Sequence, residues 1–187
     1  MFSRSEGGLA TGLDSLQISY EKHWIGWPGI CVDNEESKEE ITSRLEGINF
    51  DPVFLSVLQI KNYFVYTLYR NSFWQSYQEV NQLCCDAICR VIRPGDKVWI
   101  QDYQLMLLPG MLRKVYPDLN IGYFHHIPFP SYELFRILPE RAEILKGLLG
   151  ADFIAFHTHD YMRHFISAVE RVLRIDFKLD EAQLVNR

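Results

Sequence analysis

The chain has 187 residues, which is enough for one domain with a substantial core. Its composition, 48% hydrophobic and 23% charged residues, is ordinary for a globular protein. The net charge of −5 without a basic stripe argues against nucleic-acid binding, and no apolar run approaches the roughly 20 residues that span a bilayer. Because the start of the chain, residues 1–8, is polar and lacks a signal-peptide pattern, we expect no membrane partner and a cytoplasmic location.

The first half of the chain alternates between helix and strand patterns. A glycine-rich opening at 7–12 leads into a predicted short helix, followed by a strand at 23–27, a polar helix at 34–46 and a strand at 48–55. A long helix comes next. Its buried face is predicted from apolar residues at steps of three and four: Phe73, Tyr77, Val80, Cys84, Ala87 and Val91.

The second half continues the alternation after the helix stop at Arg93-Pro94-Gly95. Its predicted elements are, in order, a strand at 97–101, a helix at 105–116, a strand at 120–125, a proline-rich loop at 127–130, two short helices broken near Pro139, a strand at 152–156 and an amphipathic helix at 160–174. Such alternation predicts an α/β fold with a mainly parallel sheet.

The four cysteines do not form a C-x-x-C pair. Three of them, Cys84, Cys85 and Cys89, lie in the long helix, and Cys31 lies apart. We interpret them as reduced and mostly part of the core, rather than as disulfide or zinc ligands.

Three consecutive predicted strands each end in a polar side chain. Asp102, His126 and His157 follow the strands at 97–101, 120–125 and 152–156. Since parallel sheets bind ligands outside the carboxyl ends of their strands, we expect these side chains to share one edge of a cleft.

Each of the three residues also has a structural interpretation, which the sequence leaves open. Asp102 is equally consistent with a helix cap, and His126 with a histidine that shapes the proline-rich loop. His157 opens the segment His-Thr-His-Asp, which is typical of a helix start.

Other signals for a binding site are weaker. Gly7 and Gly8 would let backbone N–H groups approach a phosphate, but they do not form a G-x-G-x-x-G fingerprint or a P-loop. The histidines suggest a metal site, yet no H-E-x-x-H or matching carboxylate spacing is present. We therefore predict no metal.

Two longer segments of the chain carry recognisable sequence motifs. The segment V-W-I-Q-D-Y-Q-L at 98–105 resembles the V-W-x-H-D-Y-H-L segment of trehalose-6-phosphate synthases. The segment I-G-Y-F-H-H-I-P-F-P-S-Y-E-L-F-R-I-L-P at 121–139 is similar to their I-G-F-F-L-H-I-P-F-P-S-x-E-x-F-R-x-L-P. Segments at 7–9, 24–29 and 148–165 match in the same order, so the resemblance covers nearly the whole chain.

This resemblance implies the N-terminal half of a GT-B glycosyltransferase, a Rossmann-like doubly wound domain that faces a second such domain across a cleft. It implies glucose transfer from UDP-glucose to glucose 6-phosphate with retention of configuration, and no metal or organic cofactor. The nucleotide of the donor and the oligomeric state, including a homo-oligomer, stay open.

The resemblance also implies roles for single residues. Gly7 and Gly8 would bind the donor through backbone amides, and His126 would contact the donor sugar near the reacting centre. These are donor-side assignments, and His126 is also a predicted catalytic residue.

On the acceptor side, Asp102 would accept hydrogen bonds from sugar hydroxyls and is the second predicted catalytic residue. Trp27 would help to wall the acceptor pocket, and Tyr63 corresponds to the acceptor-binding tyrosine region. An ionised carboxylate and an indole face suit a sugar, because one accepts strong hydrogen bonds and the other packs on C–H groups.

The chain departs from the family pattern at several points. It begins at the glycine loop, it runs from Tyr63 directly into Phe64 where the family has about a dozen more residues, and it ends before the donor-binding domain. Gln101 and Gln104 replace two histidines, so we assign them no proton transfer.

From these departures we expect residues 1–187 to form a single acceptor-side domain that is inactive alone, with a missing loop between residues 63 and 64. Three alternatives remain open: a non-catalytic, synthase-like regulatory protein, a GT-B transferase with another acceptor, and an NAD-binding domain.

Overall fold

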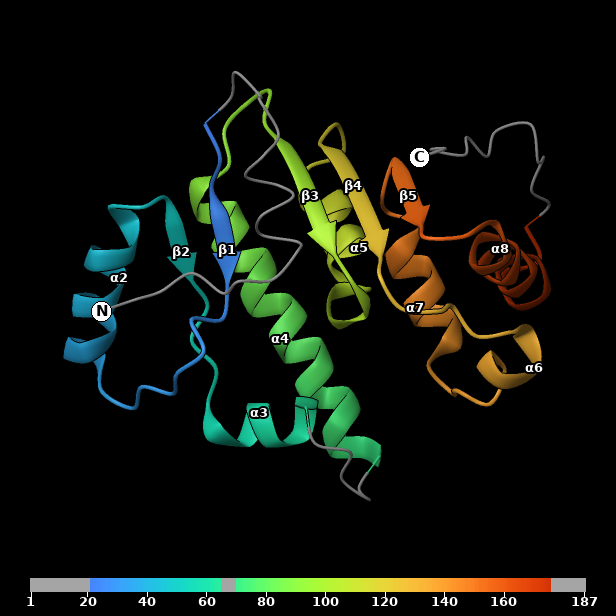
Figure 1. Ribbon diagram of the computed structural model, residues 1–187, viewed down its shortest axis with the longest axis horizontal. Helices are drawn as coiled ribbons and strands as arrows, with labels where there is room; N and C mark the ends of the chain where they lie inside the picture. The colour runs from blue at the N-terminus through green and yellow to red at the C-terminus, as the bar shows by residue number, and fades with distance from the viewer. Residues whose placement is uncertain (1–20, 65–69, 176–187) are drawn as a thin grey trace.

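The computed structural model describes residues 21–64 and 70–175, and of residues 63, 64 and 70–72 it describes the backbone alone. Strands and helices alternate along these residues, as the sequence predicts (Figure 1). The strands are β1 (Trp24–Gly26), β2 (Phe50–Pro52), β3 (Lys97–Gln101), β4 (Asn120–His125) and β5 (Phe153–Phe156). The helices are α2 (Glu35–Glu46), α3 (Val57–Phe64), α4 (Arg70–Val91), α5 (Leu108–Val115), α6 (Tyr132–Phe135), α7 (Arg141–Leu148) and α8 (His159–Leu173), with a 3-10 turn, η1, at Tyr103–Leu105.

Within the described residues the strands form two parallel sheets. β1 pairs with β2, and β4 lies between β3 and β5. All the arrows in Figure 1 point the same way, so the carboxyl ends of both sheets face one side of the molecule. The predicted α/β class with parallel strands is confirmed, although the strands divide between two sheets.

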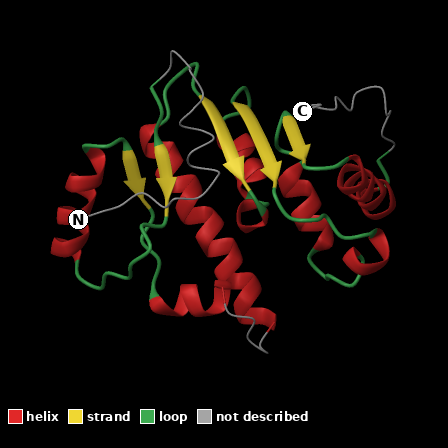
Figure 2. Cartoon of the chain, in the orientation of Figure 1, coloured by secondary structure: helices red, strands yellow, loops and turns green. Residues whose placement is uncertain are grey.

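The core lies between the three-stranded sheet and its helices (Figure 2). Ile100, Ile121 and Tyr123 alternate with more exposed residues along β3 and β4, as expected for a sheet covered on one face. The helix residues that are most deeply buried in this core are Ala87, Leu108, Leu112, Leu145, Leu148, Ala168 and Val169.

The buried face of α4 differs in part from the predicted one. Tyr77, Val80, Cys84 and Ala87 are buried as expected, but Phe73 is 40% exposed. The helix also buries two polar side chains, Ser76 and Asn81, which the apolar pattern did not include.

The boundaries of several predicted elements shift, in two of them by more than one residue at an end, and one helix was not predicted. The strand predicted at 48–55 is reduced to β2, and the helix predicted at 105–116 begins at Leu108, after η1. The helix that was not predicted, α3, begins after a capping box: the Ser56 hydroxyl accepts from the Gln59 N–H at 3.2 Å, and the Gln59 side chain accepts from the Ser56 N–H at 2.9 Å. The S-x-x-Q pattern was therefore present in the sequence.

Glycines let α5 and α7 approach closely. A Cβ at Gly150 would lie 2.5 Å from the Gly110 Cα, and a Cβ at Gly147 would lie 2.5 Å from the Met106 carbonyl oxygen. Real side chains do not tolerate such distances, so the two helices meet backbone to backbone. The segment after β3 is thereby packed against α7.

All four cysteines are free. Cys84 and Cys85 are buried, and burial raises the pKa of the Cys84 thiol to about 11. The prediction of mostly core cysteines is confirmed by these two and by Cys89, which is partly buried against the core, while Cys31 is exposed.

Candidate functional site

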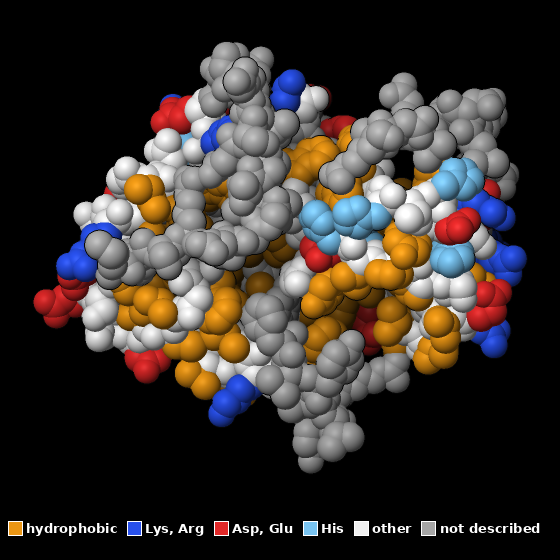
Figure 3. Space-filling model, viewed as in Figure 1, with side chains coloured by type: hydrophobic (Ala, Val, Ile, Leu, Met, Phe, Trp, Pro, Cys, Tyr) orange, Lys and Arg blue, Asp and Glu red, His pale blue; other side chains and the backbone are white. Residues whose placement is uncertain are grey.

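The carboxyl ends of β3, β4 and β5 bring the three predicted polar residues together. The His126 N–H donates to Asp102 Oδ1 at 3.1 Å, and the rings of His126 and His157 lie 5.4 Å apart. In the space-filling view, histidine side chains with an acidic side chain beside them lie over the ends of β3 and β4 (Figure 3). The expectation of one shared edge is confirmed.

Asp102 has an unusual backbone conformation. Its φ of 65° and ψ of 174° lie in a region that is almost restricted to glycine, at a cost of about 1–3 kcal/mol for other residues. Its Oδ1 accepts from the Tyr103 N–H at 2.9 Å as well as from His126, so Asp102 caps η1 and also ties β3 to β4. The capping interpretation therefore holds, but it uses only one carboxylate oxygen.

The second oxygen, Oδ2, receives no hydrogen bond from the described residues. Within the same ranges, no Lys or Arg forms an ion pair with this half-buried carboxylate. An ionised carboxylate without a cation at the end of a sheet is well placed to accept a hydrogen bond from a hydroxyl of a ligand.

His126 is held at both its backbone and its ring. Its Nε2 lies 2.5 Å from the Gln101 side-chain oxygen, and its ring packs 4.6 Å from the Phe124 ring. Since an amide oxygen is an acceptor, Nε2 carries the proton and Nδ1 is the acceptor nitrogen. Gln101 thus orients His126, a role that the sequence analysis did not assign.

His157 lies at the edge of this cluster, with its ring 5.0 Å from Phe124 in an edge contact. The next residue, Thr158, caps α8 by accepting from the Tyr161 N–H at 3.3 Å. The helix-start interpretation of this segment is therefore correct, with Thr158 rather than His157 as the cap.

Two other histidines have structural surroundings. The His164 ring bonds to the Phe129 carbonyl oxygen at 3.0 Å, so His164, on α8, contacts the proline-rich loop. His125 is buried against Phe129 and Phe156, and burial lowers its pKa to about 4. In the part of the chain that the structure describes, no group of His, Cys, Asp or Glu is arranged to hold a metal ion.

The other residues predicted for the site are Trp27, Gly7, Gly8 and Tyr63. Trp27 follows β1 at the same side of the molecule as the other strand ends, is 36% exposed, and donates from Nε1 to the Ile30 carbonyl oxygen at 3.0 Å. Gly7 and Gly8 lie outside the described residues. Tyr63 belongs to α3, but its side chain is not described.

Comparison with known proteins identifies the family. The family described as "Glycosyltransferase family 20" matches residues 1–187, the whole chain. The chain belongs to glycosyltransferase family 20. This membership agrees with the resemblance seen in the motifs and removes the NAD-binding alternative.

Proteins similar to this chain include synthases and the N-terminal domain of a phosphatase. The UDP-forming α,α-trehalose-phosphate synthase of Pichia angusta is 40% identical over 93% of the chain and 41% of the relative. A solved N-terminal domain of Candida albicans trehalose-6-phosphate phosphatase is 34% identical, with a TM-score of 0.74 over 87% of this chain and 38% of that one. A UDP-forming synthase structure from Burkholderia xenovorans is 26% identical, with a TM-score of 0.74 over 90% of this chain and 41% of that one.

The chain spans about 40% of the length of these curated family 20 synthases. No helix among the described residues is both long and apolar enough to cross a membrane.

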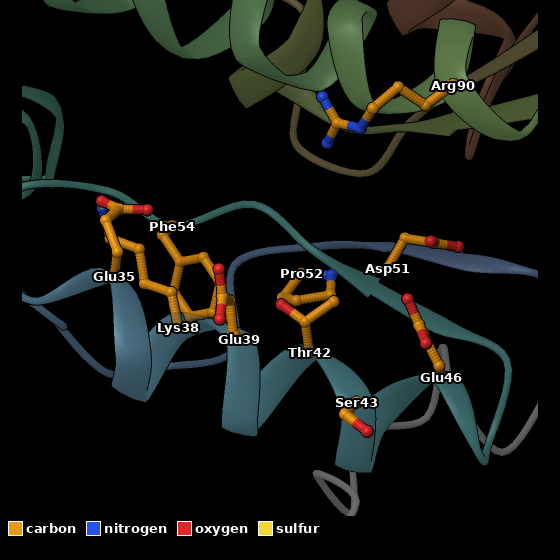
Figure 4. A pocket seen from close by; sticks show the side chains of 10 residues that line it. All are labelled: Glu35, Lys38, Glu39, Thr42, Ser43, Glu46, Asp51, Pro52, Phe54 and Arg90. Atoms are coloured by element: carbon orange, nitrogen blue, oxygen red, sulfur yellow. The ribbon is translucent and has the colours of Figure 1, made fainter.

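The family 20 domain also has an open groove of about 490 Å³, whose lining does not include Asp102, His126 or His157. It lies between α2, β2 and the end of α4, with the Arg90 side chain directed toward the strand (Figure 4). Its lining is mostly acidic and polar and includes Glu39, Glu46 and Asp51. None of the predicted site residues lines this groove, so it is not the candidate site.

Proposed function

We propose that this chain forms the acceptor-side domain of a trehalose-phosphate synthase that transfers glucose from UDP-glucose to glucose 6-phosphate. One observation carries the proposal: in a family 20 chain, Asp102 has a carboxylate oxygen at the strand edge that receives no hydrogen bond from the described residues, and it lies next to a fixed His126. Two relatives that are 40% and 38% identical are named as UDP-forming synthases, which supports the same donor and product.

On the acceptor side, Asp102 would accept hydrogen bonds from hydroxyl groups of glucose 6-phosphate through Oδ2. Trp27 and Tyr63 would line the same subsite. A carboxylate that already bonds two backbone N–H groups through Oδ1 cannot easily rotate, so the acceptor would meet a rigid partner.

On the donor side, the Nδ1 atom of His126 would accept a hydrogen bond from the glucose that is transferred. Gly7 and Gly8 would bind the phosphates of the donor through backbone amides. Because Asp102 fixes the His126 backbone at 3.1 Å, movement of either residue would disturb both subsites.

The chemistry we propose needs no protein nucleophile. The acceptor hydroxyl would attack the anomeric carbon from the face on which the phosphate departs, so the enzyme contributes positioning and stabilisation of the leaving group. This chain would supply the positioning. Since it spans about 40% of the synthases, we propose that a second domain supplies most phosphate contacts and that residues 1–187 alone are inactive.

The test is nucleotide release from UDP-glucose by the complete polypeptide that carries this chain, with and without glucose 6-phosphate. We expect release to require glucose 6-phosphate and to fall about a hundredfold in Asp102→Asn, or about 2.7 kcal/mol of transition-state stabilisation. Asp152→Asn is the matched control, because this carboxylate lies at the opposite end of the sheet, and it should retain activity.

A second function is favoured by one comparison. A relative that is 34% identical is the N-terminal domain of a protein named as a phosphatase, so this fold also occurs outside proteins named as synthases. If no common nucleotide-glucose is turned over while the polypeptide is folded, the chain is a non-catalytic, synthase-like domain, and Asp102 serves only as a cap. Release by the isolated chain would instead disprove the expected need for a second domain.

A further inference from the structure

Two side chains of α4 bond to the segment that carries Asp102, although the apolar pattern of this helix did not indicate such a role. Tyr77 and Asn81 are one helical turn apart on α4 and point to the same neighbour, the segment from Asp102 to Leu108. They are 4% and 0% exposed. Polar side chains buried this completely must find hydrogen-bond partners, and both find them in the backbone of this segment.

The Tyr77 hydroxyl makes two of these bonds. It donates to the Tyr103 carbonyl oxygen at 2.6 Å and accepts from the Met106 N–H at 3.0 Å. Burial raises the pKa of Tyr77, so the hydroxyl keeps its proton at all relevant pH values. One oxygen atom thus bonds to the backbone at the first residue of η1 and at the residue that follows its end.

Asn81 makes the next two. Its Nδ2 donates to the Gln104 carbonyl oxygen at 3.0 Å, and its Oδ1 accepts from the Leu108 N–H at 3.1 Å. Leu108 is the first residue of α5, and Leu107 before it provides no side-chain cap. Asn81 therefore caps α5 from a different helix and satisfies an N–H group that would otherwise be unpaired.

Asp102 is the residue that requires this support. A non-glycine residue with φ of 65° and ψ of 174° persists only where the surrounding structure fixes it. Its own backbone N–H is fixed to β4, by the bond to the Phe124 carbonyl oxygen at 2.7 Å. The backbone after it is fixed by Tyr77 and Asn81.

We infer that Tyr77 and Asn81 are positioning residues of the candidate site, which hold Asp102 in its strained conformation so that Oδ2 stays directed to the ligand. The inference rests on the proposed function for its kinetic consequence. It predicts a structural consequence that does not depend on that function.

The kinetic test uses Tyr77→Phe in the complete polypeptide, because phenylalanine keeps the ring contacts with Trp74 and removes only the hydroxyl. We expect the KM for glucose 6-phosphate to rise on the order of tenfold, while the KM for UDP-glucose changes less than about twofold. Val80→Ala is the control, since Val80 is buried on the same helix without a bond to the segment. It should lower stability and leave both KM values unchanged.

The structural test is hydrogen exchange of the His126 amide, which bonds to Asp102 and to neither Tyr77 nor Asn81. We expect faster exchange in Tyr77→Phe, on the order of tenfold, and no such local change in Val80→Ala. Asn81→Leu should increase the exchange rate of the His126 amide further. If the Asn81→Leu variant does not fold, the result for Tyr77→Phe alone decides whether the inference holds.

Unchanged exchange at His126 in a folded Tyr77→Phe variant would refute the positioning role, whatever the kinetics. Faster exchange in a polypeptide that shows no acceptor-dependent nucleotide release would support the positioning role and refute only the proposed function. Equal increases in both KM values would show a general loss of structure and also count against the inference.

Discussion

The two ends of the three-stranded sheet use the same interaction in opposite ways. At each end an aspartate accepts a hydrogen bond from the backbone N–H of a residue on or next to β4: Asp152 from Ile121 at 2.7 Å, and Asp102 from His126 at 3.1 Å. At the amino end, Arg113 neutralises Asp152, with a nitrogen–oxygen distance of 2.8 Å. At the carboxyl end, the described residues provide no cation for Asp102.

The difference separates a structural carboxylate from the one that we propose binds a ligand. The bond from the Ile121 N–H, with Arg113 beside it, lowers the pKa of Asp152, and Arg113 also bonds to the carbonyl oxygens of Gly150 and Pro117. Asp102 instead has a strained backbone and one carboxylate oxygen that receives no hydrogen bond from the described residues. Favourable interactions accumulate where the sheet is stabilised, while unsatisfied groups and strain accumulate where a ligand would bind.

The largest effect on stability should come from His125 in acid. Its pKa is about 4 in the folded protein and about 6.5 when unfolded, so only the unfolded state binds a proton between these values. The contribution of neutral His125 to the free energy of unfolding is therefore fully present above pH 6.5. It is lost, by about 3 kcal/mol, as the pH decreases toward 4. The measurement is urea unfolding across this range.

His125→Leu removes the titrating group and should flatten that dependence. Among the described residues His125 Nε2 has no hydrogen-bond partner, but Nδ1 lies 2.9 Å from the hydroxyl oxygen of the fully buried Tyr123. Leucine would remove this bond, so the variant should also lose about 1–3 kcal/mol of stability at pH 7. An unchanged pH dependence in this variant would assign the acid sensitivity to other groups.

Gly150→Ala should destabilise the amino end by about 2 kcal/mol, because its Cβ would lie 2.5 Å from the Gly110 backbone. Gly47→Ala is the control, since the nearest atom to its Cβ would be 3.6 Å away. Thermal unfolding of both variants tests this, and equal melting temperatures would contradict the close approach of α5 and α7.

Arg113→Met should cost about 1.5 kcal/mol, through loss of its bonds to two carbonyl oxygens and to Asp152. Arg163→Met should cost almost nothing, because Arg163 is 65% exposed and lies 3.8 Å from Asp160. Denaturant unfolding compares the two. A similar loss in both would mean that the amino end is not specially stabilised.

The smallest change in stability should come from Asp102→Gly. Glycine removes about 1–3 kcal/mol of backbone strain, and the two lost hydrogen bonds offset a similar amount, so the net change should stay below about 1 kcal/mol. Acceptor-dependent activity should nevertheless be lost. A large destabilisation would indicate that Asp102 is structural, like Asp152.

The sequence predicted the elements with clear periodicity and the polar ends of the strands. The strands at 97–101 and 120–125 were predicted with the observed limits, and the shared edge of Asp102, His126 and His157 followed from the parallel order. These succeed because period-two burial is a local pattern, and because parallel strands end at the same edge of a sheet whatever contacts their side chains make.

What was missed depends on contacts between distant residues. Tyr77 was predicted as an apolar face residue, and Asn81 was not singled out, because their partners lie more than 20 residues away in sequence. The positive φ of Asp102 also has no sequence signal, since glycine is the residue usually found there. Gln101 was recognised only as a departure from a motif, and its bond to His126 required coordinates.

The order of the strands in the larger sheet has a consequence for synthesis of the protein. β3, β4 and β5 are neighbours in the same sequence in which they leave the ribosome. Each new strand can therefore join the edge of a sheet that already exists. Because α4 precedes β3 in the chain, it can bind the segment after β3 as soon as that segment emerges. The three strand ends that carry Asp102, His126 and His157 are therefore all available once residue 157 has emerged, and the described residues add no later strand to this sheet.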